Sequence, residues 1–355
     1  MKKVLLFFLF LVFCVDFLSA KNQSDSQSEG AVVFMYHRFG ESKYPSTNIR
    51  MEQFEKHLEY LSQNEYKVWT LSKIVRHIVE GREIPKKVVA LTIDDAYKSI
   101  YTHAFARLRE YKFPFTVFVN SSPIDNGSKS YMSWDEMREM QAFGAEFANH
   151  SKTHDYMLPK EGEDEQSWKK RIKDEIESAQ KRLQEELGDA TNENPKLFSY
   201  PFGEYTKQSA EFIQSLGYVG ITQTSGVVDI DSDTKIVPRF PMAEAYADMS
   251  GFVLKLNALP LPIKEVSSKE DSLILSQNPP TLTLELKYPL KNLNCYLSNG
   301  EPLELEWASE TKVFVRAKNR LEPPRDKYTC TAPSKDGRWH WYSHLWIIKS
   351  EGSTK

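Results

Sequence analysis

Two adjacent carboxylates, Asp94 and Asp95, follow a short apolar segment at residues 88–93. A run of this kind is typical of a buried strand in a parallel sheet, and α/β folds keep their chemistry at the carboxyl ends of such strands. Because successive side chains of a strand point to opposite faces, we expect the two aspartates to have different roles. The alternative is that Asp95 is only the N-cap of a following helix.

Two histidines, His150 and His154, lie four positions apart. This spacing allows both imidazoles to reach one cation from a helical turn or a tight loop, although an isolated pair is more often structural. With Asp95 they form a two-histidine, one-carboxylate set, which in hydrolytic zinc sites leaves a coordination position for water. Asp94 would then be free to act as the base.

Strand and helix patterns alternate from residue 31 to residue 256, which predicts βα units on a parallel sheet closed, or nearly closed, into a barrel. Further along, short strands separated by Gly, Pro and Asn turns predict a small all-β sandwich. The predicted organisation is a signal peptide at residues 1–20, a polar linker at 21–30, the barrel at 31–256, a second linker at 257–272 and the sandwich at 273–350.

Three motifs, in this order, resemble those of the polysaccharide deacetylases, carbohydrate esterase family 4. They are Thr-Ile-Asp-Asp-Ala-Tyr at residues 92–97, His-Ser-Lys-Thr-His at 150–154 and Tyr-Pro-Phe-Gly at 200–203. The resemblance covers residues 31 to about 250 and implies a distorted (β/α) barrel of the polysaccharide deacetylase type. It also implies a hydrolase that removes N-acetyl groups from an N-acetylhexosamine-containing polysaccharide and uses one divalent metal ion, with Zn²⁺ as the first choice and Co²⁺, Ni²⁺ or Fe²⁺ as alternatives.

The same resemblance gives each matching residue a role. It implies Asp94 as general base, and Asp95, His150 and His154 as metal ligands. The backbone N–H of Phe202 is implied as the donor to the oxyanion.

The first strand, which ends in Tyr36-His37, is similar to the branch that deacetylates poly-N-acetylglucosamine, where the acid histidine comes first in the chain. His37 is therefore the candidate acid, and a histidine that only caps the strand is the alternative. A closing barrel could bring the first strand beside the last, so the sequence separation is no obstacle. The arginine that often precedes Tyr200 in the family is missing, and Arg239 is the candidate to pair with Asp94 in its place. An ordinary surface arginine is the alternative.

Four aromatic residues close to these motifs are candidates for stacking on sugar faces, although any one of them is more often a core residue. They are Tyr36, Trp134, Tyr200 and Tyr205.

The N-terminus has the three parts of a secretory signal: two lysines, an apolar run at residues 4–18, and Ser19-Ala20 before a polar tract. The run is short for a membrane span of about 20 residues, so cleavage is favoured over retention as an anchor. We expect an exported protein, periplasmic or secreted, with no membrane span after cleavage.

An oxidising compartment predicts a disulfide between Cys295 and Cys330. Tyr328, two residues before the second cysteine, and Trp307 between the two resemble the immunoglobulin pattern, and a chance match in an unrelated sandwich is the alternative. The net charge of −3 does not indicate a nucleic-acid partner. The sandwich itself could bind glycan or protein.

Two other functions remain open at this point. An esterase on the same scaffold, removing O-acetyl groups from xylan or another glycan, would use the same motifs. A non-catalytic glycan-binding or assembly protein would not need the base Asp94.

Overall fold

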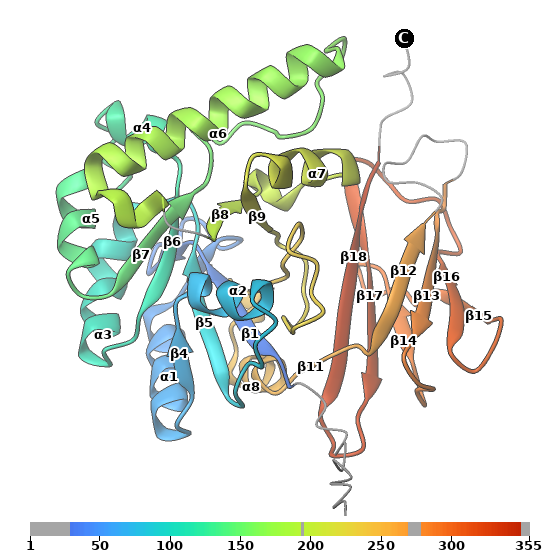
Figure 1. Cartoon of the computed structure of the whole chain (residues 1–355). Coiled ribbons are helices and arrows are strands. Elements are labelled where there is room, and N and C mark those ends of the chain that lie inside the picture. Colours follow the sequence, from blue (N-terminus) through green and yellow to red (C-terminus); the bar gives the residue numbers. More distant parts are fainter. Residues whose placement is uncertain (1–28, 193–194, 269–277, 349–355) are drawn as a thin grey trace, which may run out of the picture.

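The computed structural model describes residues 29–192, 195–268 and 278–348. An α/β part, blue to yellow in Figure 1, lies beside a β part in orange and red. The predicted signal peptide, and the predicted linker up to residue 28, lie outside the described residues. In the part of the chain that is described, no helix is long and apolar enough to cross a membrane.

The α/β part is built on a curled sheet in which every strand pairing is parallel, as the sequence predicts. The strand order is β10 (Phe240–Pro241), β1 (Ala31–Tyr36), β5 (Val88–Ile93), β6 (Phe115–Val119), β7 (Ala145–Asn149), β8 (Lys196–Ser199) and β9 (Tyr218–Ile221), and β4 (Lys67–Trp69) also pairs with β5. The short strands β2 (Arg38–Phe39) and β3 (Asn48–Ile49) form a separate pair.

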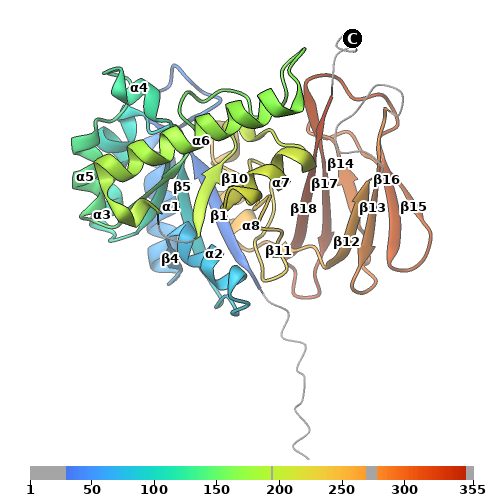
Figure 2. The ribbon, with the colours of Figure 1, turned by 45° about the horizontal axis from the view of Figure 1, so that its top comes forward.

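Helices fill the connections between these strands, and α6 crosses the front of the α/β part in Figure 2. This helix packs against β7. The helices are α1 (Met51–Gln63), α2 (Leu71–Val79), η1 (Ile100–Ala104, a π-helix), α3 (Phe105–Glu110), α4 (Ser121–Asp125), α5 (Trp134–Gln141), α6 (Glu165–Leu187), η2 (Asp189–Asn192), η3 (Pro201–Gly203), α7 (Lys207–Ser215), η4 (Glu244–Tyr246) and α8 (Met249–Leu256).

The two ends of the curled sheet approach each other through the segment at residues 237–241. Val237 bridges Ile221 of β9, and Phe240 pairs with Phe34 of β1. This segment therefore contacts both ends and gives the sheet the character of a distorted barrel.

The first strand reaches the site for a different reason from the one we expected. β1 pairs directly with β5, with Tyr36 opposite Ile93, and the Asp94 N–H donates to the Tyr36 carbonyl over 2.9 Å. His37 and Asp94 therefore follow neighbouring strands, so their proximity does not depend on closure of the barrel.

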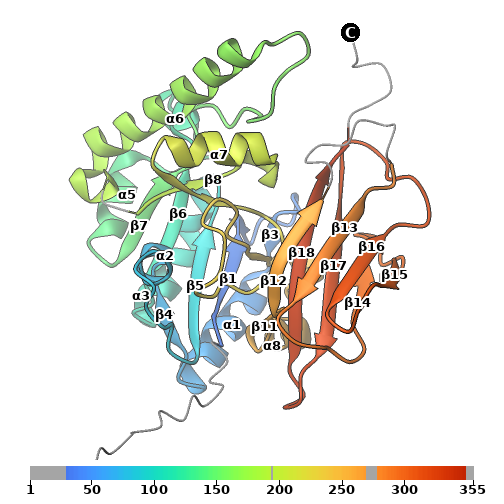
Figure 3. The same cartoon turned by 45° about the vertical axis from the view of Figure 1, so that its right-hand side comes forward.

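The β part consists of two four-stranded sheets packed face to face, with β18 on the side of the barrel (Figure 3). One sheet has the order β11 (Leu259–Pro260), β18 (Trp339–Ile347), β17 (Arg325–Pro333) and β14 (Asn294–Tyr296), and the other β12 (Ile263–Ser268), β13 (Thr281–Leu286), β16 (Lys312–Arg316) and β15 (Glu304–Trp307). The ring of Trp341 on β18 meets that of Phe240 edge-on, with centroids 5.3 Å apart.

The predicted linker at residues 257–272 is wrong over much of its length, because β11 and β12 lie within it. β11 pairs in parallel with β18, and β12 pairs with β13. Prolines suggested a linker, but proline is tolerated at the edge of a sheet, where its missing N–H breaks no ladder.

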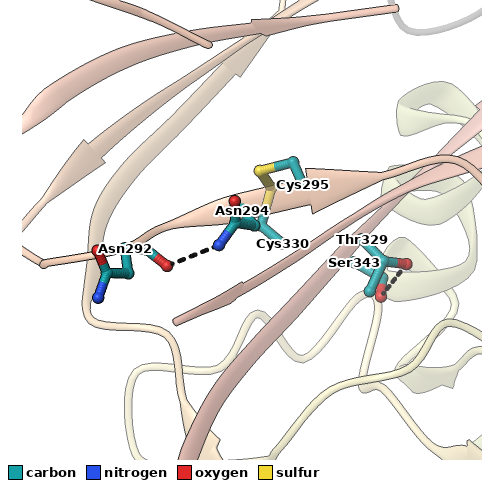
Figure 4. Close-up of a disulfide and its surroundings, with 6 residues drawn as sticks. All are labelled: Asn292, Asn294, Cys295, Thr329, Cys330 and Ser343. Carbon is teal, nitrogen blue, oxygen red and sulfur yellow. Dashed lines mark hydrogen bonds between the residues drawn. A yellow bond between two sulfur atoms is a disulfide. The ribbon is translucent and has the colours of Figure 1, made fainter. Parts of the chain in front are cut away.

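A disulfide joins Cys295 and Cys330 (Figure 4). These residues lie opposite each other on β14 and β17, which are antiparallel neighbours in one sheet. In immunoglobulin domains the disulfide links the two sheets and a buried Trp packs on it, whereas Trp307 here is 41% exposed. The immunoglobulin interpretation of this cysteine pair is therefore wrong.

Tyr328 is nevertheless a structural element of the sandwich. Its buried hydroxyl accepts from the Ala317 N–H over 3.0 Å and donates to the Pro280 carbonyl over 2.9 Å. It thereby joins β17 to backbone at the ends of β13 and β16.

We predict that Tyr328→Phe lowers the free energy of unfolding by about 1–3 kcal/mol, because it leaves a buried backbone N–H and carbonyl without this partner. Tyr296→Phe, which changes a 37% exposed ring in the same sandwich, is the control and should have little effect. Urea denaturation of the two variants measures the difference. Equal midpoints would mean that the Tyr328 hydroxyl is not needed.

Candidate active site

The residues that the sequence singled out gather at the carboxyl ends of the parallel strands. His37 follows β1, Asp94 and Asp95 follow β5, and His150 follows β7. Arg239 reaches the same place from the segment just before β10.

The two aspartates separate because the chain leaves the strand between them. Asp95 has φ = 74° and Ala96 has φ = 59°. Left-handed backbone at two consecutive non-glycine residues is uncommon and is held only where the surroundings determine it. An N-cap residue has extended backbone, so the interpretation of Asp95 as a simple helix cap is wrong.

Asp94 is fully buried and forms a bidentate ion pair with Arg239, with N–O distances of 2.7 and 2.8 Å. The Arg239 guanidinium also donates to the Thr222 carbonyl, Thr92 Oγ1 and Ser199 Oγ. All five N–H groups of this buried arginine therefore have acceptors. The alternative of a surface arginine is excluded.

This ion pair sets the charge of Asp94. Burial alone would raise the pKa of the carboxyl, but the adjoining Arg239 outweighs it and holds the pKa of Asp94 below its usual range. Asp94 is therefore ionised at neutral pH and able to accept a proton.

The second aspartate lies with the two histidines. Asp95 Oδ1 is 3.3 Å from the Nε2 atoms of both His150 and His154, and one ligand atom from each residue fits within 4.8 Å. The buried atoms Asp95 Oδ1 and His150 Nε2 have no hydrogen-bond partner among the described residues. Buried polar atoms without partners are costly, and a cation between them would satisfy both.

Different neighbours set the protonation of the two histidines. His150 Nδ1 lies 2.8 Å from the Ser199 carbonyl, which requires a proton on Nδ1 and turns Nε2 towards Asp95. Burial, together with nearby His150, lowers the pKa of His154 to about 4, so its imidazole is neutral at pH 7. Burial also acts to lower the pKa of His150, but its hydrogen bond to Asp95 and the negative charges of Asp94 and Asp95 outweigh burial and raise that pKa. The same carboxylates would attract a divalent cation, which binds carboxylate and the neutral form of imidazole, so these residues fit a metal site.

A tight loop, not a helical turn, carries the histidine pair. Ser151 and His154 both have positive φ, 67° and 62°. Asn149 at the end of β7 accepts from the Ser151 N–H over 2.8 Å and donates to the Ile176 carbonyl of α6 over 2.9 Å. The long helix α6 therefore fixes the loop from behind.

His37 is half-buried beside this cluster. Burial lowers its pKa, and the positive Arg239 acts in the same direction, while the negative Asp94 and Asp95 partly offset the shift. A lowered pKa makes the protonated imidazole a stronger acid, although a smaller fraction is protonated at neutral pH.

Phe202 forms another wall of the site. Its backbone is left-handed, with φ = 59°, in the short helix η3. Its ring meets His154 edge-on at 4.5 Å and stacks on Tyr156 at 4.3 Å.

Comparisons with known proteins show which family part of the chain matches. The family model described as Polysaccharide deacetylase matches residues 81–221. The poly-β-1,6-N-acetyl-D-glucosamine N-deacetylase of Staphylococcus epidermidis is 25% identical over 211 residues, covering 56% of this chain and 70% of the relative. The Staphylococcus aureus enzyme of the same name is 24% identical over 221 residues, covering 59% of this chain and 73% of the relative.

Two solved structures share the fold of the α/β part. The Streptococcus pyogenes deacetylase PplD has a TM-score of 0.56 at 20% identity, covering 64% of this chain and 98% of that one. IcaB from Ammonifex degensii has a TM-score of 0.54 at 24% identity, with coverages of 65% and 98%. Residues 81–221 therefore match the polysaccharide deacetylase family. The matches span 66–73% of the length of these curated relatives.

Within this deacetylase fold, three of the four predicted sugar-stacking residues are core residues. The Tyr36 hydroxyl lies 3.1 Å from His57 Nδ1, the Tyr200 hydroxyl donates to a backbone carbonyl over 2.8 Å, and the Trp134 indole donates to Asp125 over 2.9 Å. All three rings are buried and cannot stack on a sugar. Proximity in sequence was the only reason for choosing them, and it does not determine which way a ring points.

Tyr205 is half-buried and lines a cavity of about 560 Å³ between barrel and sandwich. The candidate metal ligands Asp95, His150 and His154 do not line this cavity. Tyr156, which is 48% exposed and stacks on Phe202, was not predicted as a site residue. Its position two residues after His154 was the available signal. Ser199 and Asn149 were not predicted either, because nothing in the surrounding sequence distinguishes them from other polar residues at strand ends.

We predict that His150→Ala and His154→Ala each lose bound divalent metal, because each removes one of three candidate ligands of this deacetylase site. His103→Ala, which changes an exposed histidine elsewhere, is the matched control and should keep the metal content of the wild type. Elemental analysis after dialysis gives the metal content per chain. Full metal content in both site variants would contradict the ligand assignment.

Proposed function

We propose that this protein is a metal-dependent N-deacetylase that hydrolyses N-acetyl groups of an N-acetylhexosamine polysaccharide. The observation that carries the proposal is the separation of Asp94 from Asp95: one carboxylate lies with two histidines, and its neighbour is held ionised by a buried arginine. The names of the staphylococcal relatives support poly-β-1,6-N-acetylglucosamine as the substrate to test first.

A divalent ion held by Asp95, His150 and His154, for which we propose Zn²⁺, would supply Lewis acidity towards the acetyl carbonyl and the attacking water. The remaining chemistry belongs to the chain. Amide hydrolysis adds water to the carbonyl carbon, breaks the C–N bond and releases acetate and a sugar amine.

Asp94 is the proposed base. Within the described structure, Arg239 and Ser199 occupy three of about four lone-pair positions of the Asp94 carboxylate, so one on Oδ1 remains for the proton of the water. The rigid ion pair also fixes the direction in which this oxygen points.

His37 is the proposed acid that protonates the leaving nitrogen, because it follows the strand next to Asp94 and its lowered pKa favours proton donation. The Phe202 N–H is the proposed donor to the oxyanion, and the left-handed backbone of Phe202 supports this role because such strain is often kept at functional sites. We also propose an exported location, which the Cys295–Cys330 disulfide supports.

We predict that the wild type releases acetate from N-acetylated glycans in a panel that also contains O-acetylated xylan. Asp94→Asn should keep its metal but lose acetate release by about 10²–10⁴-fold, because an amide cannot accept the proton. Release from xylan alone would favour the esterase function. No release by a metal-loaded wild type from any glycan would favour a non-catalytic binding protein.

A second prediction concerns the acid. His37→Ala should lower turnover on the glycan by about 10²–10⁴-fold and leave the metal content unchanged. Activated aryl acetates have leaving groups that need no proton, so the loss on them should be much smaller. Parallel kinetics on both substrates provide the test, and equal losses would exclude His37 as the acid.

A further inference from the structure

A pocket of about 310 Å³ lies between the barrel and the sandwich, beside the candidate active site. The barrel contributes Phe202, Gly203, Gln223 and Thr224, and the sandwich contributes Ser298, Arg325, Asp326, Lys327 and Leu345. Phe202 lines this pocket and also packs against His154, so the pocket and the metal-ligand set share a wall. Its volume is at the small end of the roughly 300–1,000 Å³ of ligand pockets.

The sandwich is tied to the barrel at this place. The Arg325 guanidinium donates to the Phe202 carbonyl and pairs with Glu204 at 3.1 Å. The pocket is therefore a built junction between the two parts, and it adjoins the loop that carries the proposed oxyanion donor.

Two side chains of the pocket have polar groups available to a ligand. Among residues 29–192, 195–268 and 278–348, neither the Gln223 amide nor the Lys327 ammonium has a hydrogen-bond partner. Gln223 comes from the barrel and Lys327 from β17, so a ligand that bonded both would bridge the two parts.

The charges at the pocket favour an uncharged ligand. Arg325 is paired with Glu204, and Lys327 lies next to Asp326, so the two cations are balanced by two anions. An uncharged ligand rich in hydroxyl and amide groups can accept hydrogen bonds from the Gln223 amide and the Lys327 ammonium. It needs no net charge on the pocket to bind.

From these observations we propose that the pocket is a subsite for an uncharged N-acetylhexosamine unit next to the reacting one in the glycan chain. The inference rests on the proposed function and adds that the sandwich helps to bind the substrate. Gln223 and Lys327 are the proposed binding residues.

The test uses β-1,6-linked N-acetylglucosamine oligomers of one to five units with the full chain. Binding is measured by titration calorimetry, and hydrolysis is measured by acetate release. A small aryl acetate, which cannot span two subsites, is the reference substrate. Gln223→Ala keeps the Cβ atom, which packs closely on Gly203, and Lys327→Ala removes only the side chain beyond Cβ.

We expect each variant to bind the four-unit oligomer roughly 3- to 10-fold more weakly, which is the effect of one lost hydrogen bond on the affinity. The affinity for the single sugar unit should change little. The ratio of kcat/KM for the four-unit oligomer to that for the aryl acetate should fall by a similar factor. Lys287→Ala, which removes a cross-junction ion pair with Asp231 outside the pocket, is the matched control and should leave this ratio unchanged. Thermal melting checks that all three variants fold.

The outcomes are distinguishable. Equal affinities for the four-unit oligomer in wild type and both pocket variants, or equal losses for the single sugar unit and the four-unit oligomer, would overturn the subsite. If the wild type binds the oligomers and the variants weaken binding, but no acetate is released, the subsite stands and the proposed function fails.

Discussion

The buried ion pair between Asp94 and Arg239 is the interaction on which the rest of the site depends. Transfer of two charges out of water is expensive, and the attraction repays it only with good geometry and full hydrogen bonding. Here the pair is bidentate, all five donors of Arg239 have acceptors, and three of about four lone-pair positions of the Asp94 carboxylate have donors. Removal of one partner from such a pair typically costs about 3–5 kcal/mol. Asp94 is therefore confined to one position and one charge state.

The pair also connects the site to the barrel. Arg239 lies in the segment that contacts both ends of the sheet, and it bonds to Thr222 after β9, Ser199 at the end of β8 and Thr92 on β5. One side chain thus joins three strands at their carboxyl ends. Closure of the sheet and orientation of the proposed base follow from the same set of hydrogen bonds.

Much of this site could be predicted from the sequence because its chemistry is local. A carboxylate at a strand end and a closely spaced histidine pair can each be recognised within a short stretch of sequence. The family motifs add the order in which these residues occur along the chain. The orientation of aromatic rings was not predictable in this way: Tyr36 and Tyr200 sit next to site residues, yet both rings are turned into the core. The sandwich shows the same limit, because the spacing of two cysteines does not reveal whether they lie on one sheet or on two.

Phe202 connects the candidate metal site to the sandwich. Its ring touches a candidate metal ligand, its carbonyl accepts from Arg325 of the sandwich, and its left-handed backbone is supported on both sides. A residue in sparsely populated backbone conformation persists only where its surroundings determine it, at a cost of about 1–3 kcal/mol. Here part of those surroundings lies outside the region matched by the family model, which ends at residue 221. The sandwich therefore contacts the loop that contains Phe202, and the geometry of this loop depends on the sandwich as well as on the barrel.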